Sequence, residues 1–214
     1  MAHPNRGYVY KGFFWLLHEE RVLLENFNDD PLALDAVNLV LSECAIDGVS
    51  SLEDQNNLDV VNAVNCLSTA LRSVLSKGFS FNTFNTTYQP DMDGYIKWPS
   101  SVYSVKAVDG TRLLNQAGYV VKPDEGFTPI FTGPLDVTLV AELPPSSLPA
   151  PVWDYIIFRA AELMNDRWIT SDVVGVNINK HLTESWVSFR QWWIDDEDAS
   201  VFEGSAIQNL MGRT

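Results

Sequence analysis

The chain has 214 residues, of which 46% are apolar, and this is enough to bury the core of a folded protein of one or two domains. Its 28 acidic residues outnumber its 14 basic residues and give a net charge of -14. This excess of acid argues against a groove that grips nucleic acid tightly, because phosphate groups are bound by Lys and Arg, but it is compatible with a surface along which nucleic acid slides.

The cysteine content and the apolar runs exclude several further classes. Cys44 and Cys66 are the two cysteines, and both lie in helix-like segments, where we expect small buried apolar side chains. A disulfide framework or a zinc site would require more cysteines or a Cys/His cluster, so we expect a reducing compartment, no metal and no cofactor. No run is long enough for a membrane-spanning helix, and Phe13–Leu17 is too short for a signal peptide.

The first 30 residues are expected to form an arm and a short helix. Residues 1–12 contain basic residues and no acid, as is common in flexible terminal segments. Phe13–Phe27 has the apolar content of a short helix. Asp30 and Pro31 are then suited to cap the next helix and to begin its first turn.

Two longer helices are predicted before residue 80. The first spans about Leu32–Ala45 and ends at Asp47-Gly48, and the second spans about Leu58–Lys77 and ends at Gly78. Each has apolar residues at helical spacing on one face: Leu34, Val37, Leu41 and Ala45 in the first, and Val60, Val64, Leu67, Leu71, Val74 and Leu75 in the second.

From Phe79 onward the apolar period becomes that of β-strands. Short strands are predicted at Phe79, Phe81 and Tyr88, at Ile96–Val108 with a break at Pro99, at Tyr119–Val121 and at Asp136–Ala141. Asp93-Gly94, between Tyr88 and Tyr95, and Asp109-Gly110 are predicted hairpin turns, and Pro123–Pro134 is a predicted loop. We therefore expect an antiparallel sheet between the second long helix and the next one.

Leu143–Trp168 is the stretch around which the rest of the chain is organised. Four prolines exclude a helix before about Val152, and Pro151 suits a first helical position. The apolar residues that follow are spread too widely for a single stripe, which predicts a helix buried by neighbours on two sides. Ala160 and Ala161 would allow another helix to approach closely. An ordinary core helix explains the same periodicity.

The last part of the chain is predicted to contain a break, a helix and a tail. The break covers Ile169–Gly175, and the helix covers Val176–Ile194 with a heavy apolar load. Asp195–Asp198 is a block of four acids, which is unfavourable near the C-terminal end of a helix. We therefore expect this block to leave the helix or to meet an external partner, and residues 195–214 to form a tail.

Taken together, the pattern predicts an α+β protein: a helical bundle with an inserted antiparallel β-sheet domain and a C-terminal helix and tail. The expected divisions are residues 1–30 (arm and short helix), 31–78 with 150–194 (bundle), 79–149 (β-rich insertion) and 195–214 (tail).

The sequence contains no catalytic or metal-binding constellation that we can assign. His181 and Glu184 share a helical face, but a di-metal site needs several such carboxylates on facing helices, so a solvated pair is favoured. Asp91–Gly94 is similar to the start of a calcium loop, but Val102 stands where the final glutamate belongs, so a turn is favoured. We therefore assign no catalytic, cofactor-binding or metal-binding residue and expect no enzyme.

The order of these elements and several short sequences are similar to those of a known family. Ala36–Asn38 (AVN) lies in a helix that ends in an Ile-Asp-Gly turn, and Val49–Glu53 (VSSLE) follows it. The second helix closes on Ser76–Asn82 (SKGFSFN), and the later helix carries Ala160-Ala161 and ends in Asn165–Trp168. Over about residues 33–210 the chain resembles the tail tubular protein A family, the head-to-tail adaptors of short-tailed bacteriophages. Its first 30 residues are longer than expected for the family, and Phe79 replaces the usual Trp.

The resemblance implies a structural protein of the virion tail that forms a ring of about twelve subunits. Such a ring would dock under the portal protein at the head-tail junction and carry the tail nozzle (tail tubular protein B), with tail fibres near that second junction. Double-stranded genomic DNA would pass through the lumen without specific binding, during retention after packaging and during ejection. The resemblance also implies assembly in the cytoplasm of the bacterial host and no contact with a membrane.

On this basis portal contacts are expected in Ile194–Leu210 and in the N-terminal arm, and nozzle contacts around Gly110 and in Pro123–Pro134. The doubly apolar helix from Val152 could help to supply ring contacts. Two other functions stay open: a virion-associated hydrolase that uses His181 and Glu184, and a monomeric acidic binding module.

Overall fold

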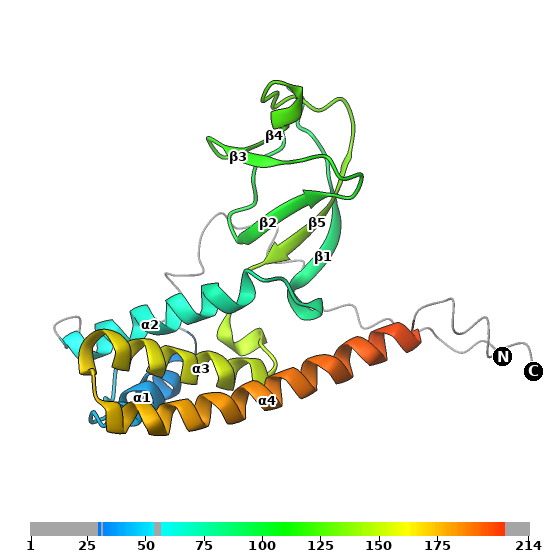
Figure 1. The fold of residues 1–214 in the computed structure, drawn as a ribbon. Coiled ribbons are helices and arrows are strands. Elements are labelled where there is room, and N and C mark those ends of the chain that lie inside the picture. Colours follow the sequence, from blue (N-terminus) through cyan, green and yellow to red (C-terminus); the bar gives the residue numbers. More distant parts are fainter. Residues whose placement is uncertain (1–29, 31, 54–56, 204–214) are drawn as a thin grey trace, which may run out of the picture.

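The computed structural model describes residue 30, residues 32–53 and residues 57–203. Within them, α-helices form a bundle and a β-domain stands on one side of it (Figure 1). This confirms the predicted α+β class, with a helical bundle and an inserted antiparallel sheet. The helices are α1 (Ala33–Glu43), α2 (Leu58–Leu75), α3 (Ala150–Met164) and α4 (Asp172–Glu203), and the strands are β1 (Thr83–Tyr88), β2 (Val102–Ala107), β3 (Leu114–Gln116), β4 (Tyr119–Val121) and β5 (Leu135–Ala141).

The first two helices begin and end close to the predicted positions. The Asn57 side chain caps α2 by accepting the backbone N–H groups of Asp59 and Val60. The loop after α1 is held by Asn38, whose Nδ2 donates to the carbonyl oxygen of Val49 while its Oδ1 accepts the N–H of Val49. Both helices bury an apolar face in the bundle, as predicted, although Leu34 and Val64 are only partly buried and Ala45, which follows α1, is exposed.

The helix α3 lies at the centre of the bundle. It packs against α1, α2 and α4, which confirms the expectation that it is buried by neighbours on more than one side. Ala160 and Ala161 are both fully buried, and Cys44 Sγ lies 3.7 Å from the carbonyl oxygen of Ala161. Its buried residues are Val152, Trp153, Ile156, Ile157, Ala160, Ala161 and Met164. Because these apolar residues face the chain's own helices, they stabilise the subunit and are not exposed for contact with another subunit.

The predicted break between the last two helices is shorter than expected. The chain winds on after α3 as a π-helical turn over Asn165–Ile169 and reverses at Thr170, whose φ is 52°. The Asn165 side chain bonds to the backbone N–H and carbonyl oxygen of Ser171 and thereby holds the reversal. These bonds complete the reversal within a few residues, so that α4 already starts at Asp172. The prediction that Ile169–Gly175 is irregular is therefore wrong for most of its length.

The end of α4 is the largest departure from the sequence prediction. The helix continues to Glu203, past the expected end at Ile194, so the prediction that Asp195 leaves the helix is wrong. The acids have partners in the chain: Asp196 accepts from Ser80 Oγ at 2.6 Å, and Glu197 accepts from Trp193 Nε1 at 2.7 Å. Because the helix runs on, these acids also lie before its last turn, where the macrodipole opposes them less. The predicted helix Phe13–Phe27 and residues 204–214 of the predicted tail lie outside the described residues.

The β-domain is built around its last strand. The order in the main sheet is β1-β5-β2, with β5 antiparallel to both neighbours and Tyr88 opposite Leu135. Alternate residues of β5 (Leu135, Val137, Leu139 and Ala141) are buried, as expected for a sheet covered on one face. Leu135 and Val137 belong to a small core inside the β-domain, whereas Leu139 and Ala141 belong to the core of the bundle. The strand therefore joins the two cores.

The predicted hairpins are wrong, although turns form at both positions. The N–H of Gly94 bonds to the carbonyl oxygen of Asp91, and that of Gly110 to the carbonyl oxygen of Ala107. Across the first turn the N–H of Asp91 also bonds to the carbonyl oxygen of Tyr95, but neither turn joins two paired strands. Tyr95 instead bridges to Ile130, and β2 pairs with β5. The hairpin that does form joins β3 and β4 through Ala117 and Gly118, both at positive φ. The predicted strand at Phe79 and Phe81 is also wrong, because Ser80–Asn82 is a 3-10 turn and β1 starts at Thr83.

The cysteines are buried and reduced in the bundle, as predicted. Burial raises the pKa of both thiols to about 11. We therefore expect neither Cys44 nor Cys66 to react with a thiol reagent such as Ellman's reagent at pH 8 in the folded protein, and both to react in denaturant. Rapid labelling of one thiol without denaturant would show that its helix opens locally.

No helix among the described residues combines the length and the apolar content needed to cross a lipid bilayer.

Candidate functional site

The segment Ser76–Asn82 lies where the bundle meets the β-domain. It leaves the C-terminal end of α2, makes a 3-10 turn and enters β1 (Figure 1). The returning chain crosses the same place, since β5 ends at Ala141 and leads to α3. We call Ser76–Asn82 the junction segment. It sets how the two parts of the molecule are held together.

Asn82 is the central polar residue of the junction segment and is fully buried. Its Nδ2 donates to the carbonyl oxygens of Leu75 and Ala141, at 2.9 and 3.0 Å, and its Oδ1 accepts the N–H of Phe79 at 2.8 Å. One amide group thus bonds to the end of α2, to the end of β5 and to the turn between them. An amide suits this place because it both donates and accepts, which a carboxylate or an apolar side chain cannot do.

Gly78 is required for two separate reasons. Its φ is 75°, in the left-handed region where a glycine ends a helix without strain. A Cβ at this position would also lie 3.0 Å from Cγ2 of Val140 on β5. The β-domain therefore approaches the end of α2 so closely that even a methyl group would displace the Val140 side chain.

Replacing Gly78 by Ala should lower the free energy of unfolding by about 2 kcal/mol, because the left-handed conformation costs about 1 kcal/mol and the methyl group displaces Val140. The matched control is Gly118→Ala, since Gly118 has φ 83° and nothing within 4 Å of its Cβ position. Urea denaturation of both variants separates the two causes. Equal losses would mean that crowding by Val140 contributes nothing.

Aromatic side chains fix α4 to the junction segment. Phe79 contacts Phe189 and Trp193 of α4 edge-on, with ring centroids 5.2 and 5.4 Å apart. Phe81 stacks on Phe79 and contacts Trp192. The part of α4 that follows the bundle is therefore held beneath the β-domain by packing and by the Ser80–Asp196 bond.

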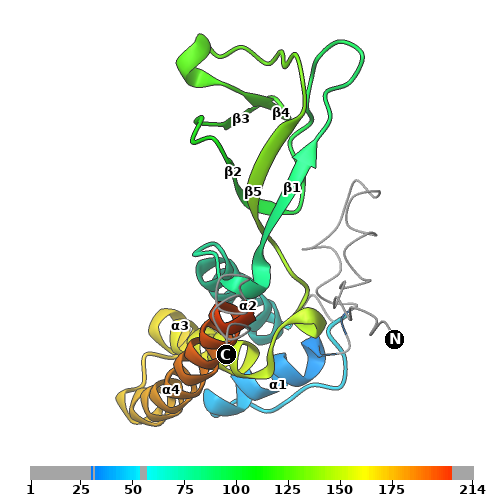
Figure 2. The same ribbon diagram turned by 90° about the vertical axis from the view of Figure 1, so that its right-hand side faces the viewer.

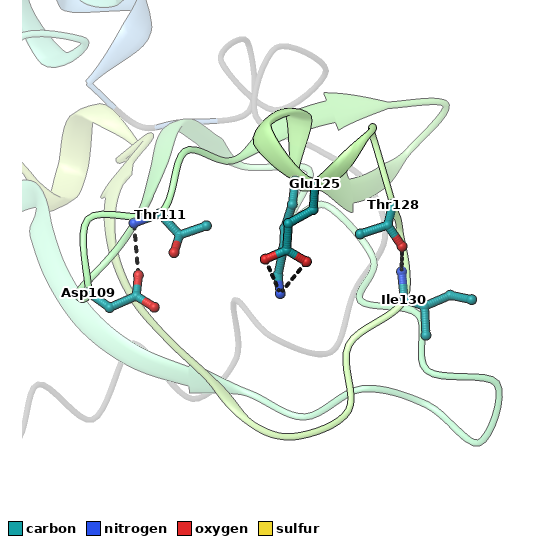
Figure 3. A network of polar contacts seen from close by, with 6 residues as sticks. Asp109, Thr111, Glu125, Thr128 and Ile130 are labelled. Carbon is teal, nitrogen blue, oxygen red and sulfur yellow. Dashed lines mark hydrogen bonds and ion pairs between the residues drawn. The ribbon is translucent and has the colours of Figure 1, made fainter.

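The loops at the far end of the β-domain are held by local polar contacts (Figure 3). The Asp109 carboxylate accepts the N–H of Thr111 at 2.8 Å, and this bond lowers the pKa of that carboxyl. Glu125 pairs with Lys122 at 3.3 Å. These loops leave apolar side chains in solvent at Val108, Phe127 and Ile130. Their shape is thus fixed while their apolar groups stay available for contact.

The histidine considered for catalysis pairs with a residue of another helix. His181 Nδ1 lies 2.9 Å from Oε2 of Glu43 on α1, so its carboxylate partner is Glu43 and not Glu184. The turn predicted at Asp91–Gly94 is present, with the Asp91 carboxylate accepting two backbone N–H groups of the turn. Among the described residues, no group of three or more His, Cys, Asp or Glu is arranged to hold a metal ion.

A family model described as tail tubular protein matches residues 34–196, which cover both halves of the bundle and the whole β-domain. The chain belongs to the tail tubular protein family. No curated protein matches the chain. The resemblance found in Ser76–Asn82 and the neighbouring helices is thereby confirmed at the level of the family.

As a tail tubular protein, the chain is a structural component of the bacteriophage tail and assembles with other tail proteins. Its functional sites are therefore expected to be surfaces. Sequence reasoning identified the junction segment but missed that Phe189, Trp192 and Trp193 dock on it. The signal for this was the density of aromatic residues in both segments.

Proposed function

We propose that this tail tubular protein is the head-to-tail adaptor of a short-tailed bacteriophage, without enzymatic activity. In this role it forms a ring of about twelve subunits that joins the portal to the nozzle at the head-tail junction. Genomic DNA is retained above the ring after packaging and passes through it on ejection. The subunits assemble in the cytoplasm of the host cell, and tail fibres attach near the nozzle junction.

The membership of the family carries this proposal. Two features of the molecule support it. The β-domain projects away from the bundle, so each subunit has two distant ends that can contact different proteins (Figure 1). The junction segment fixes these ends relative to each other, as is needed in a part that transmits force between head and tail.

The charge of the chain fits a conduit for DNA. At -14 for each subunit, a ring of about twelve carries on the order of 170 negative charges. Those that line a lumen would repel the phosphate backbone and keep the genome mobile, since tight binding requires Lys and Arg.

We place the nozzle contact on the far loops of the β-domain, around Gly110 and in Pro123–Pro134, and the portal contact in Ile194–Leu210 and in the N-terminal arm. Phe127→Asp tests the nozzle contact, because Phe127 is exposed and Asp tolerates its φ of 60°. We expect binding to the nozzle protein of the same phage to weaken by about tenfold or more, since the variant places a charge in a contact. Leu58→Asp, an exposed site on the bundle, is the control and should bind normally.

The proposal as a whole is tested by the mass of the purified protein, alone and with the portal protein of the same phage. Light scattering and electron microscopy should show a ring, or a monomer that becomes a ring on the portal. A monomer that ignores the portal at every concentration would contradict the proposal and favour an acidic binding module.

A further inference from the structure

The helix α4 has a second apolar face that the subunit itself leaves uncovered. Its first face is turned into the core at Ile178 and Phe189. On the opposite side, exposed positions recur at intervals of three and four residues: Val173, Val176, Lys180, Thr183, Val187, Arg190 and Ile194. We call these seven residues the outer face of α4. Its four aliphatic side chains are 77% (Val173), 69% (Val176), 60% (Val187) and 41% (Ile194) exposed.

The spacing of the outer face is that of a helix-packing seam. The positions follow a seven-residue repeat, with β-branched Val173, Val187 and Ile194 at one heptad position and Lys180 at the same position between them. A seam with this period keeps one side turned toward a partner helix over its length, here about 30 Å at 1.5 Å per residue. A charged residue at a position that is otherwise apolar, as Lys180 is here, selects the partner and its register.

The charge of the outer face differs from that of the rest of the chain. Its two ionisable residues are Lys180 and Arg190, both basic, in a chain with twice as many acids as bases. An apolar seam with a central lysine fits a partner that places an acid between two apolar residues.

The outward side of α1 has that arrangement. Leu32, Asp35 and Leu39 are exposed at intervals of three and four residues, and the two leucines are 39% and 38% exposed. In Figure 2, α4 lies at the lower left of the bundle and α1 at the lower right, with α3 and α2 above them. One subunit therefore presents a basic apolar seam and an acidic apolar seam in different places.

We propose that the outer face of α4 packs against the Leu32–Asp35–Leu39 face of α1 in a second copy of this chain, with Lys180 opposite Asp35. This inference rests on the proposed ring and names its subunit contact. Two different faces make a head-to-tail contact, which closes into a ring when the rotation between copies permits. In this proposal the ring contacts come from α4 and α1 and not from α3, because the apolar residues of α3 are buried inside the subunit.

Val187→Glu is the first test. A carboxylate at this exposed position leaves the monomer folded but is desolvated in the seam, so the concentration for half-assembly, with or without the portal, should rise by about tenfold or more. Met92→Glu, which adds the same charge at an exposed apolar site in the β-domain, is the control and should assemble like the wild type. Circular dichroism confirms that both variants are folded, and light scattering measures assembly.

Charge reversal identifies the partner face. Lys180→Glu and Asp35→Lys should each weaken assembly, and the double variant should recover most of the loss, because the pair is restored with the opposite polarity. Lys106→Glu on β2 combined with Asp35→Lys controls for net charge and should recover nothing.

The outcomes separate this inference from the proposed function. A wild-type protein that never forms a ring overturns both. If Val187→Glu forms rings as readily as the wild type, the inference is overturned while the proposed function stands. If those rings also fail to bind the portal, the outer face belongs to the portal contact. A double variant no better than the single variants overturns the pairing of α4 with α1.

Discussion

Replacing Asn82 by Ala should lower the free energy of unfolding by about 3–5 kcal/mol, the range expected when a buried polar network loses its central member. The side chain is fully buried and makes bonds to Leu75, Phe79 and Ala141. Without it, two carbonyl oxygens and one N–H are left buried without these partners. Urea denaturation with linear extrapolation measures the loss.

Two further variants show whether the cause is the hydrogen-bond geometry. Asn82→Asp keeps the acceptor for Phe79 but places a carboxylate against the two carbonyl oxygens, so it should cost at least as much as Ala near neutral pH. Asn85→Ala on β1, which removes an exposed side-chain bond from Thr138 on β5, should cost less than about 1 kcal/mol. A loss below about 1 kcal/mol for Asn82→Ala would show that water replaces the amide and that the junction does not depend on it.

Replacing Phe189 by Ala should lower the free energy of unfolding by about 3–5 kcal/mol, because the substitution removes a buried aromatic ring and leaves a cavity. Phe189 is 1% exposed and contacts Phe79 of the junction segment, Tyr155 of α3 and the neighbouring Trp186 and Trp192. The ring thus lies where α3, α4 and the junction segment meet. Thermal and urea denaturation measure the change.

The location of the damage is as informative as its size. Hydrogen exchange of Phe189→Ala should show faster exchange in the part of α4 after residue 189 than in α1, since that part is held by the aromatic cluster. Ser188→Ala, at an exposed neighbour on the same helix, should change the free energy of unfolding by no more than about 0.5 kcal/mol and leave the pattern of hydrogen exchange unchanged. Uniformly faster exchange throughout the bundle would mean that α4 does not open separately.

The sequence was sufficient to predict the bundle and its insertion. Apolar residues of α1, α2 and α3 repeat at helical spacing because each helix buries one side or more, and Gly78 and Pro151 mark helix ends by local chemistry. The Asn57 cap of α2 was not predicted. The junction segment was found through its similarity to the family motif and through Gly78 as a helix end, whereas the role of Asn82 was not predicted.

The sheet could be predicted only in part. Asp-Gly pairs define a turn through their own backbone, but strand pairing depends on residues far away in the chain. Here β5 inserts between β1 and β2, so the segments on either side of Asp93-Gly94 and of Asp109-Gly110 find other partners. The turn at Ala117-Gly118 was missed because alanine seldom adopts positive φ.

The length of α4 was missed for a related reason. The acids after Ile194 oppose a helix end, and the sequence alone does not show that the helix continues or that Ser80 binds Asp196. The outer face of α4 was hidden because its seven-residue repeat is superposed on the core-facing repeat, and the two together give no single apolar stripe.

The insertion of the β-domain has a consequence for biosynthesis. The helices α1 and α2 leave the ribosome before Thr83–Ala141, whereas α3, which fills the space between them, is made only afterwards. Until Ala150–Met164 has emerged, α2 cannot pack against α3, and its apolar residues, among them Val60, Leu67 and Leu71, form an exposed apolar surface that is prone to aggregate. Closing so long a loop also slows folding. We expect nascent chains stalled before Ala150 to bind chaperones that hold unfolded proteins, and chains released beyond Phe189 to fold without them.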